Sequence, residues 1–353
     1  MWSFDRHYFV KRHKQLLHHN HLLDLHLYLS FQSRRRSFSR HQPLQSPNQN
    51  NHHLIIMSEG QFKKDFQIPV ADQKPPGVQK DMKGPTPQNE HLPTEDGGFH
   101  LYKAAGKLEG KKAIITGGDS GIGRAIAIMY AMEGADSLIA YLEVEEEDAQ
   151  ETKKKVESYG RTCHLLQVDL KKKEDCQKVI DTALEKMGAI NILVNNHAYQ
   201  NMVEDIKDLT EEQWEFTFAT NIHPFFYLSK YALPHMKQGD TIINNASINA
   251  YIGRPDLLDY TSTKGAIISF TRGLHNQYVG RGIRVNAVAP GPVWTPLIPA
   301  TMNHQAQKEF SSPIGRPSQP SEIATCFVFL ANSDSASISG QTIHANGGVV
   351  VNG

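Results

Sequence analysis

Short apolar runs alternate with longer segments of helical character along the last two-thirds of the chain. The apolar or β-rich runs are 112–116, 137–141, 164–170, 191–196, 240–247, 283–290 and 341–348. Segment 145–158 begins with acidic residues and continues with basic ones, which suits the dipole of a helix. Thr210-Glu211-Glu212-Gln213 is a capping-box pattern ahead of another helix. This alternation predicts an α/β domain whose seven-stranded parallel sheet is covered by helices on both faces.

The first 107 residues do not follow this rhythm. Residues 1–56 hold nine of the 18 histidines, eight basic residues and only two acidic ones. Such a leader is either an organelle transit peptide, which predicts a mitochondrial or plastid protein, or sequence upstream of a true start at Met57, which predicts a cytoplasmic one. Residues 57–107 are polar, rich in Pro and Gly, and show no sustained apolar period, which predicts an extended arm. The folded body is then 108–353.

Composition narrows the function classes. No run of about 18 apolar residues occurs, so we expect no membrane span. Residues 57–353 carry 29 basic and 35 acidic side chains, which does not favour nucleic-acid binding. The three cysteines, Cys163, Cys176 and Cys326, are widely spaced and predict neither a disulfide framework nor a metal site.

A glycine-rich segment, TGGDSGIGRA at 116–125, follows the first strand of the body and opens a helix. Gly117, Gly121 and Gly123 would let the backbone approach a dinucleotide pyrophosphate at the helix N-terminus. Glycine motifs are weak alone, but a strand before and a helix after are the context that this one requires. We therefore expect a nicotinamide dinucleotide here.

The choice of dinucleotide depends on the tip of the second strand. An acidic residue there would bind the ribose 2′-hydroxyl of NAD(H). The strand ends at Tyr141-Leu142, and Glu143 lies beyond the tip. This favours NADP(H), with NAD(H) as the alternative. No basic residue stands at the tip, and Arg124 is either a phosphate ligand or a charge on the helix surface.

The segment DYTSTKG at 259–265 places Tyr260 and Lys264 four residues apart, on one face of a helix. A nearby cation stabilises the phenolate and should lower the pKa of Tyr260 from about 10. A tyrosine tuned in this way can serve as general acid for a carbonyl or general base for an alcohol.

Together these motifs resemble the classical short-chain dehydrogenase/reductase family over residues 108–353. The matching segments are TGGDSGIG at 116–123, NNHA at 195–198, TNI at 220–222, Ser247, YTSTK at 260–264 and PGPVWTP at 290–296. GGDSGIGRA, EEEDAQET and LLDYTSTKGAI are most similar to a subgroup described as NADPH-dependent aldehyde reductases and glucose and ribitol dehydrogenase homologues. The resemblance implies a doubly wound Rossmann fold. It also implies a homotetramer that packs through the helix bearing Tyr260 and the helix before it.

The resemblance assigns roles to individual residues. Tyr260 would be the proton donor, with Ser247, Lys264 and Asn221 completing the catalytic set. Asp169 would receive the adenine amino group, with Leu170 beside the ring. The expected cofactor-binding residues are Gly117, Ser120, Gly121, Ile122, Gly123, Tyr141, Asp169, Leu170, Asn195, Asn196, Tyr260, Lys264, Pro290, Val293 and Thr295.

The implied activity is reduction of an aldehyde or ketone by hydride transfer from NAD(P)H. Two alternatives stay open: a sugar or polyol dehydrogenase working in the oxidative direction, and an NAD(P)-binding sensor without catalysis. The sequence departs from the family in the NNHA segment, where His197-Ala198 stands in place of the Ala-Gly of the family's NNAG motif. This histidine is either a further acid/base or a structural residue, and its place in a motif that sets backbone geometry favours the structural role.

Overall fold

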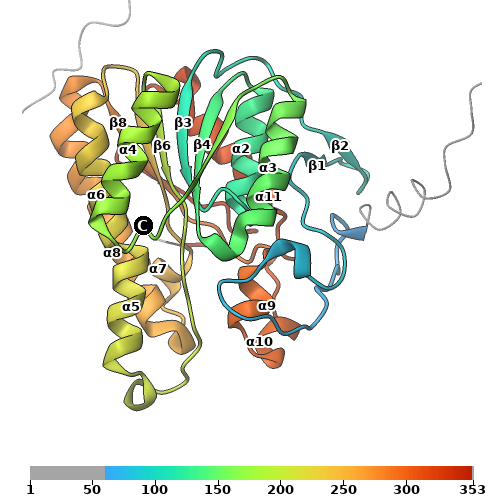
Figure 1. Ribbon diagram of the computed structural model, residues 1–353. Helices are drawn as coiled ribbons and strands as arrows, with labels where there is room; N and C mark the ends of the chain where they lie inside the picture. Colours follow the sequence, from blue (N-terminus) through green and yellow to red (C-terminus); the bar gives the residue numbers. More distant parts are fainter. Residues whose placement is uncertain (1–59, 352–353) are drawn as a thin grey trace, which may run out of the picture. The chain divides into compact units, whose positions relative to one another are not determined.

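Seven parallel strands form the centre of the computed structural model (Figure 1), which describes residues 60–351. The α/β prediction and the parallel sheet are confirmed, and each strand falls within or next to an expected apolar run. The strand order is β5-β4-β3-β6-β7-β8-β9. Their bounds are β3 Lys112–Thr116, β4 Asp136–Tyr141, β5 Cys163–Gln167, β6 Ile192–Asn195, β7 Thr241–Asn245, β8 Arg284–Val288 and β9 Thr342–Ile343.

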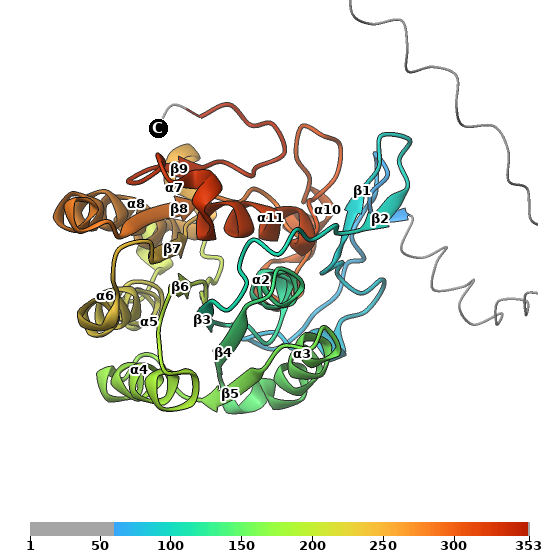
Figure 2. The ribbon, with the colours of Figure 1, turned by 90° about the horizontal axis from the view of Figure 1, so that it is seen from above.

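Helices cover both faces of this sheet, as in a doubly wound Rossmann fold. Figure 2 shows α2, α3 and α11 on one face, and α4, α5, α6 and α8 on the other. Their bounds are α2 Gly121–Met132, α3 Glu146–Ser158, α4 Lys173–Met187, α5 Glu211–Asn221, α6 His223–Ala232, α8 Leu258–Tyr278 and α11 Pro320–Ala331. Three short helices belong to loops: α7 Asn249–Ile252, α9 Leu297–Thr301 and α10 His304–Lys308.

The core lies on the two faces of the sheet because successive side chains of a strand point to opposite sides. In β3, Ala113 and Ile115 join the apolar cluster under α2 and α11, whereas Ile114 joins the cluster under α4 and α6. All three are fully buried. A strand that is buried on both faces is continuously apolar, and for this reason the sequence pattern located it.

The sheet reverses its connection order between β3 and β6. Loops that follow two such neighbouring strands diverge and leave a crevice, which is where open α/β sheets bind their ligands. The glycine turn after β3 and the Asn195-Asn196 segment at the end of β6 meet at this crevice.

Part of the expectation for the N-terminal arm is wrong. The described part of the arm, 60–107, contains an antiparallel hairpin of β1 His91–Pro93 and β2 Phe99–Leu101, and a short 3₁₀ helix, η1 Gln79–Asp81. Phe62 and Ile68 are buried, and Ile68 packs in a cluster with Trp294. The arm has no apolar period because the body, and not the arm itself, supplies the surface that buries these side chains.

The leader, residues 1–56, lies outside the described residues. Within the described part of the chain, no helix has the length and apolar character needed to cross a membrane.

Candidate active site

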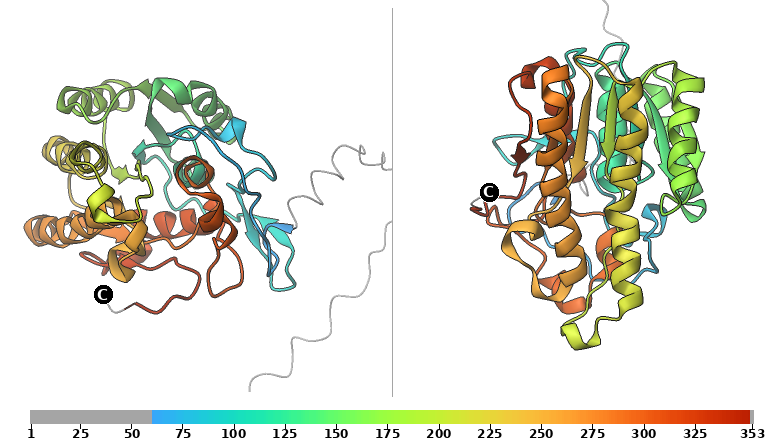
Figure 3. Two further views of the ribbon diagram at one scale, coloured as in Figure 1. Left: turned by 90° about the horizontal axis from the view of Figure 1, so that it is seen from below. Right: turned by 90° about the vertical axis from the view of Figure 1, so that its left-hand side faces the viewer.

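A cavity of about 560 Å³ lies at the crevice. Its walls come from the segments that follow β3, β4, β5, β6, β7 and β8, from the α9 region, and from the N-terminal arm. Figure 3 shows these loops gathered at one end of the sheet.

The glycine turn forms one wall of this cavity. Gly117 and Gly121 have φ of +60° and +50°, a region that favours glycine. A Cβ on Gly123 would lie 1.9 Å from the carbonyl oxygen of Gly117, so only glycine allows the helix to start this close to the strand. Ser120 is the N-cap of α2, yet its side chain makes no capping hydrogen bond. The Gly121 N–H at the start of the turn donates to Gln79 Oε1 at 2.9 Å, so the N–H groups that follow it are the ones an anion could use.

Asn196 fixes this turn from the neighbouring strand. Its Nδ2 donates to the carbonyl oxygens of Thr116 and Gly117, both at 3.0 Å, and its Oδ1 accepts from Asn245 at 2.8 Å. Asn195 was expected in the cofactor site, but it does not line the cavity. Its Nδ2 donates to Asn244 inside the sheet, because successive side chains of a strand alternate between faces.

Tyr260, Ser247 and Lys264 converge on the other wall. Tyr260 and Lys264 come from the first two turns of α8, and Ser247 follows β7. The Ser247 side chain lies on the same wall as the Tyr260 side chain and lowers the pKa of that phenol slightly. Lys264 Nζ donates to the carbonyl oxygen of Asn245 at 2.8 Å and lies 5.3 Å from the centre of the Tyr260 ring. The fold therefore brings these three predicted residues to one wall of the cavity.

The expected lowering of the tyrosine pKa is not found among the protein groups. Burial raises the pKa of Tyr260 to about 12, and the Ser247 side chain only partly opposes this. Burial also lowers the pKa of Lys264 to about 7, so this lysine carries only part of a charge at neutral pH. The sequence pattern shows the spacing of the two residues but not their depth, and here burial outweighs the attraction.

Asn221 has a supporting position behind this wall. Its Oδ1 accepts from the backbone N–H of Tyr199 at 2.7 Å, and its Nδ2 donates to the Tyr199 carbonyl and to Thr263 Oγ1. Asn221 is fully buried and does not line the cavity. Its side chain therefore connects α5 and the loop after β6 to α8.

His197 lines the cavity, but both of its ring nitrogens have protein partners. Nδ1 lies 2.7 Å from Thr116 Oγ1, and Nε2 lies 3.0 Å from the carbonyl oxygen of Thr220. Burial, followed by the nearby Lys264, lowers the pKa of His197 to about 4. A neutral ring held at both nitrogens favours the structural role over that of an acid/base.

The opposite end of the cavity is crowded with carboxyl groups that the sequence analysis did not single out. Asp119 and Glu145 line the cavity beside Tyr141 and Leu142. Burial raises the pKa of Asp119 to about 6. Burial, with Asp119 nearby, raises that of Glu145 to about 8. Glu145 follows Leu142 by three residues, and its Oε2 accepts from the Leu142 N–H at 2.8 Å. That loop turns its side chain back towards the strand tip.

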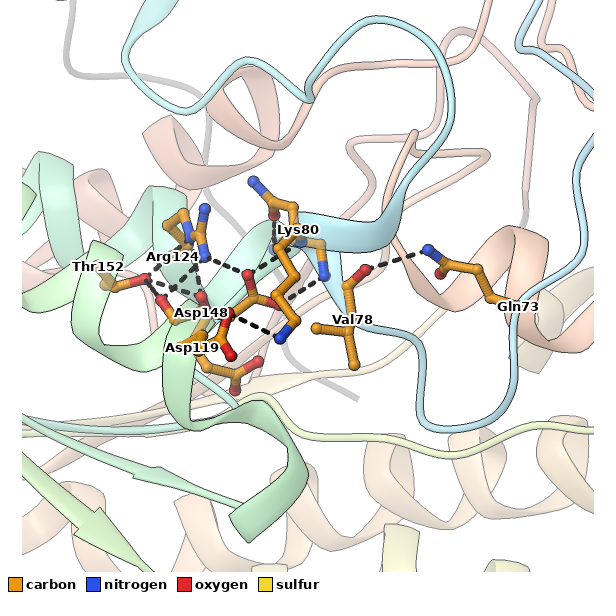
Figure 4. A network of polar contacts seen from close by, with 10 residues as sticks. Gln73, Val78, Lys80, Asp119, Arg124, Asp148 and Thr152 are labelled. Carbon is orange, nitrogen blue, oxygen red and sulfur yellow. Dashed lines mark hydrogen bonds and ion pairs between the residues drawn. The ribbon is translucent and has the colours of Figure 1, made fainter.

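Arg124, for which the sequence left a phosphate ligand and a helix-surface charge as alternatives, does not line the cavity. Its guanidinium donates to the carbonyl oxygens of Asp119 and Asp148, at 2.8 and 2.9 Å, and to Thr152 Oγ1 (Figure 4). It also forms an ion pair with the buried carboxylate of Asp148, at 3.3 Å. Arg124 is therefore neither a helix-surface charge nor a phosphate ligand, but an internal connection between the glycine turn and α3.

Most of the expected residues line this one cavity, and a few do not. Those that do are Gly117, Ser120, Gly121, Ile122, Tyr141, Asp169, Leu170, Asn196, Ser247, Tyr260, Lys264, Pro290, Val293 and Thr295. Gly123, Asn195 and Asn221 lie behind its walls. The structure adds Asp119, Glu145 and the arm residues Pro75, Pro76 and Gly77. The only sequence feature that could have indicated a role for the arm in this cavity is Pro75-Pro76-Gly77 ahead of a polar segment. The same feature is equally typical of a linker.

These residues suit a nicotinamide dinucleotide. A glycine-rich helix N-terminus whose N-cap side chain makes no capping hydrogen bond fits a diphosphate. Gly121 packs against Thr295, since a Cβ there would lie 3.1 Å from Thr295 Cγ2. The glycine turn thus lies directly beside Thr295, another of the expected cofactor-binding residues.

Comparison with known proteins agrees with this geometry. Residues 117–350 match a family model described as enoyl-(acyl carrier protein) reductase. The chain is 47% identical over 290 residues to glucose and ribitol dehydrogenase of Daucus carota, covering 80% of this chain and 98% of that protein. It is 47% identical over 276 residues to NADPH-dependent aldehyde reductase 1, chloroplastic, of Arabidopsis thaliana, covering 75% of this chain and 96% of that protein.

The fold agrees as well. A short-chain dehydrogenase from Burkholderia cenocepacia, solved in complex with NADP, superposes with a TM-score of 0.65 at 30% identity, covering 69% of this chain and 98% of the other. The chain belongs to the short-chain dehydrogenase/reductase family. This short-chain dehydrogenase/reductase is accordingly an NAD(P)-dependent oxidoreductase.

Proposed function

We propose that this oxidoreductase reduces small aldehydes or ketones with NADPH, and that Tyr260 is the general acid. One observation carries the proposal: Tyr260, Ser247 and a buried Lys264 line the same cavity. Among residues 60–351 no carboxylate forms a salt bridge with Lys264, although burying an unpaired cation is costly. Strongly perturbed groups in a cleft are typical of catalytic sites.

Each residue then has a distinct task. The bound dinucleotide supplies the hydride. Tyr260 O–H donates its proton to the carbonyl oxygen of the substrate, and the Ser247 hydroxyl orients that oxygen. Lys264, when charged, binds the nicotinamide ribose and favours the phenolate that remains.

The preference for NADPH is supported from two sides. The Arabidopsis relative is named as NADPH-dependent, and the Burkholderia structure contains NADP. In this chain, a Glu145 pKa of about 8 leaves that carboxyl mostly uncharged at neutral pH, so it can lie beside a 2′-phosphate without strong repulsion. NADH remains a usable alternative, because no arginine or lysine follows the tip of β4 in the 141–145 segment.

The substrate end of the cavity favours compact, partly apolar carbonyl compounds. Its lining there includes Phe216, Ile252, Ile298, Met302 and Phe310. A free sugar would leave many hydroxyl groups against this apolar surface without hydrogen-bond partners, which is unfavourable. The name of the carrot relative nevertheless makes polyol oxidation the alternative to test.

Two further proposals concern the whole protein. We expect a homotetramer that packs through α8, which bears Tyr260, and the helix before it; Phe226 on α6 is exposed by 47% and supports a contact on this side of the sheet. Sedimentation equilibrium tests this. For residues 1–56 the relative named as chloroplastic supports the transit-peptide alternative. Fluorescent fusions with and without residues 1–56 distinguish an organelle from the cytoplasm.

The activity is tested by following reduced-nicotinamide absorbance with the full chain. NADPH and NADH would each be combined with short and long aldehydes and a ketone, and NADP⁺ and NAD⁺ with glucose and ribitol. We expect NADPH consumption with aldehydes to exceed every oxidative rate at pH 7. Faster oxidation of ribitol or glucose would favour the polyol dehydrogenase. Dinucleotide binding without turnover of any compound would favour the sensor.

A further inference from the structure

The N-terminal arm lies against the cavity as part of its wall. We call residues 71–88 the strap. Pro75, Pro76 and Gly77 of the strap line the cavity together with the glycine turn and the α9 segment. The strap therefore contacts two parts of the site that are far apart in sequence, the dinucleotide turn and the substrate loop.

At the glycine turn, the backbone of the strap is held by a buried carboxylate. Asp148 Oδ2 accepts from the N–H of Gln79 at 2.5 Å, and its Oδ1 accepts from the N–H of Lys80 at 3.1 Å. Arg124, which is paired with Asp148, also donates to the carbonyl oxygen of Asp119 inside the turn. Figure 4 shows this connection from the strap through Asp148 and Arg124 to the turn.

Gln79 makes the direct contact. Its side-chain Oε1 accepts a hydrogen bond, at 2.9 Å, from the backbone N–H of Gly121. Gly121 is the first residue of α2 and belongs to the glycine turn. Gln79 is only 5% exposed, and within residues 60–351 its Nε2 has no hydrogen-bond partner. Gln79 does not itself line the cavity. Any influence of this side chain on a bound ligand therefore passes through its hydrogen bond to Gly121.

At the substrate loop, the strap is held equally closely. The N–H of Gln73 donates to the Pro299 carbonyl at 3.0 Å, and Ala71 exchanges two hydrogen bonds with the Gln307 side chain. Gly77, with φ of +91°, approaches so closely that a Cβ would lie 2.4 Å from the carbonyl oxygen of Pro296. The strap thus ties the position of α9 and α10 to the position of the glycine turn.

We propose that Gln79 is a positioning residue for the dinucleotide: it fixes Gly121 of the glycine turn and couples that turn, through the strap, to the substrate loop. The inference rests on the proposed function, because it needs a dinucleotide in this cavity. Dinucleotide binding and docking of the strap then stabilise one another, and such coupling is reciprocal.

The test compares Gln79→Ala with Gln88→Ala in the full chain. Gln88 lies in the same strap, but its side chain reaches only the neighbouring carbonyl of Thr86, at 3.5 Å. Dissociation constants for NADPH and NADH would be measured by nicotinamide fluorescence. We expect Gln79→Ala to weaken both about tenfold, the scale of one lost buried hydrogen bond, and Gln88→Ala to stay within twofold. Both dinucleotides should be affected alike because they share the diphosphate.

A second readout follows the strap itself. Trypsin can cleave after Lys80 and Lys83, which lie in the strap. Saturating NADP⁺ should slow this cleavage in the parent and in Gln88→Ala, and should slow it much less in Gln79→Ala. If Gln79→Ala only loosened the strap, without affecting its coupling to the dinucleotide, cleavage would be faster than in the parent by the same factor with and without NADP⁺.

A third variant keeps the inference testable if Gln79→Ala fails to fold. Gln79→Glu retains an oxygen acceptor for Gly121 and adds a negative charge beside the diphosphate. Its affinity for NADPH should fall at low ionic strength and recover partly as salt is added.

The opposite results are equally clear. Affinities within twofold of the parent for both Gln79 variants would overturn the inference, as would tighter binding by Gln79→Ala, since Gln79 would then compete with the dinucleotide for Gly121. If the parent itself binds no dinucleotide, the proposed function fails together with this inference. If the parent binds and the Gln79 variants bind equally well, only this inference fails.

Discussion

The two ends of the cavity are built on opposite electrostatic plans. At the catalytic end, one buried lysine lies beside Tyr260, and burial lowers its pKa to about 7. At the other end, Asp119 and Asp148 lie near Arg124 and Glu145 lies near Asp119, and burial raises the pKa of all three carboxyl groups. Among the described residues, Lys264 at the catalytic end has no carboxylate paired with it, whereas the three carboxyl groups at the other end share one arginine.

This difference indicates that the catalytic end can perform chemistry, whereas the carboxyl end holds structural elements in position. An unpaired cation next to a phenol changes how readily a proton moves. A salt-bridged arginine that donates to three other groups holds two elements in place, and its pair is expensive to break. We therefore expect variants at the catalytic end to affect turnover, and variants at the carboxyl end to affect stability and dinucleotide choice.

The largest effect on stability is expected for Arg124→Met. The change removes the cation that compensates Asp148 and the bond to the carbonyl of Asp119. Urea unfolding at pH 7 should show a loss of about 3–5 kcal/mol, as for other buried pairs that lose one partner. Arg281→Met is the matched control, because Arg281 is exposed and should change stability by less than about 0.5 kcal/mol. An equal loss of unfolding free energy in the two variants would contradict the role of Arg124 in holding the glycine turn to α3.

Lys264→Met tests whether the buried lysine at the catalytic end makes the stability of the protein depend on pH. The folded-state pKa of Lys264 is about 7, below its ordinary value of 10.5. Between these pH values the unfolded chain binds a proton that the folded chain lacks, so the parent gains stability as pH rises, by at most about 1.4 kcal/mol per pH unit. The variant lacks this gain, and its stability relative to the parent should increase as pH is lowered from 9.5 to 7.

The control for this titration is Lys230→Met, at an exposed position on α6. Its stability relative to the parent should not depend on pH over the same range. A Lys264→Met curve that runs parallel to the parent would show that the buried lysine keeps its ordinary pKa.

The smallest effect is expected at Glu145. Above a pH of about 8 its carboxyl ionises and would repel a 2′-phosphate. The affinity of the parent for NADPH should therefore fall several-fold between pH 7 and pH 9, more than that for NADH, and Glu145→Gln should remove this difference. Glu143→Gln, two residues earlier and exposed, should behave as the parent. An unchanged pH dependence in Glu145→Gln would place the phosphate elsewhere.

The sequence predicted the sheet and the catalytic wall because both depend on regular spacing. β3 and β4 contain the apolar runs 113–115 and 138–141, and Tyr260 and Lys264 are one helical turn apart. Even β9, with only Thr342–Ile343 paired, lies within an expected run.

The other half of the cavity was not predictable in the same way. The strap is ordered by single contacts to the body, such as Gln79 with Gly121 and Ala71 with Gln307, and single contacts leave no period in the sequence. The pKa values of Tyr260 and Glu145 are raised by burial. The depth of a side chain cannot be inferred from the spacing of a motif or from a position at the end of a strand. The sequence thus located the chemistry but not the electrostatic surroundings.

The central claim is that Tyr260 donates the proton in carbonyl reduction, and a comparison of the full chain with Tyr260→Phe tests it most directly. The variant keeps the ring and loses only the hydroxyl, so fluorescence titration should give an NADPH dissociation constant within about twofold of the parent. Under saturating NADPH and aldehyde, kcat should fall by at least about 100-fold, the scale of a lost general acid. Unchanged binding with kcat within about tenfold of the parent would contradict the account.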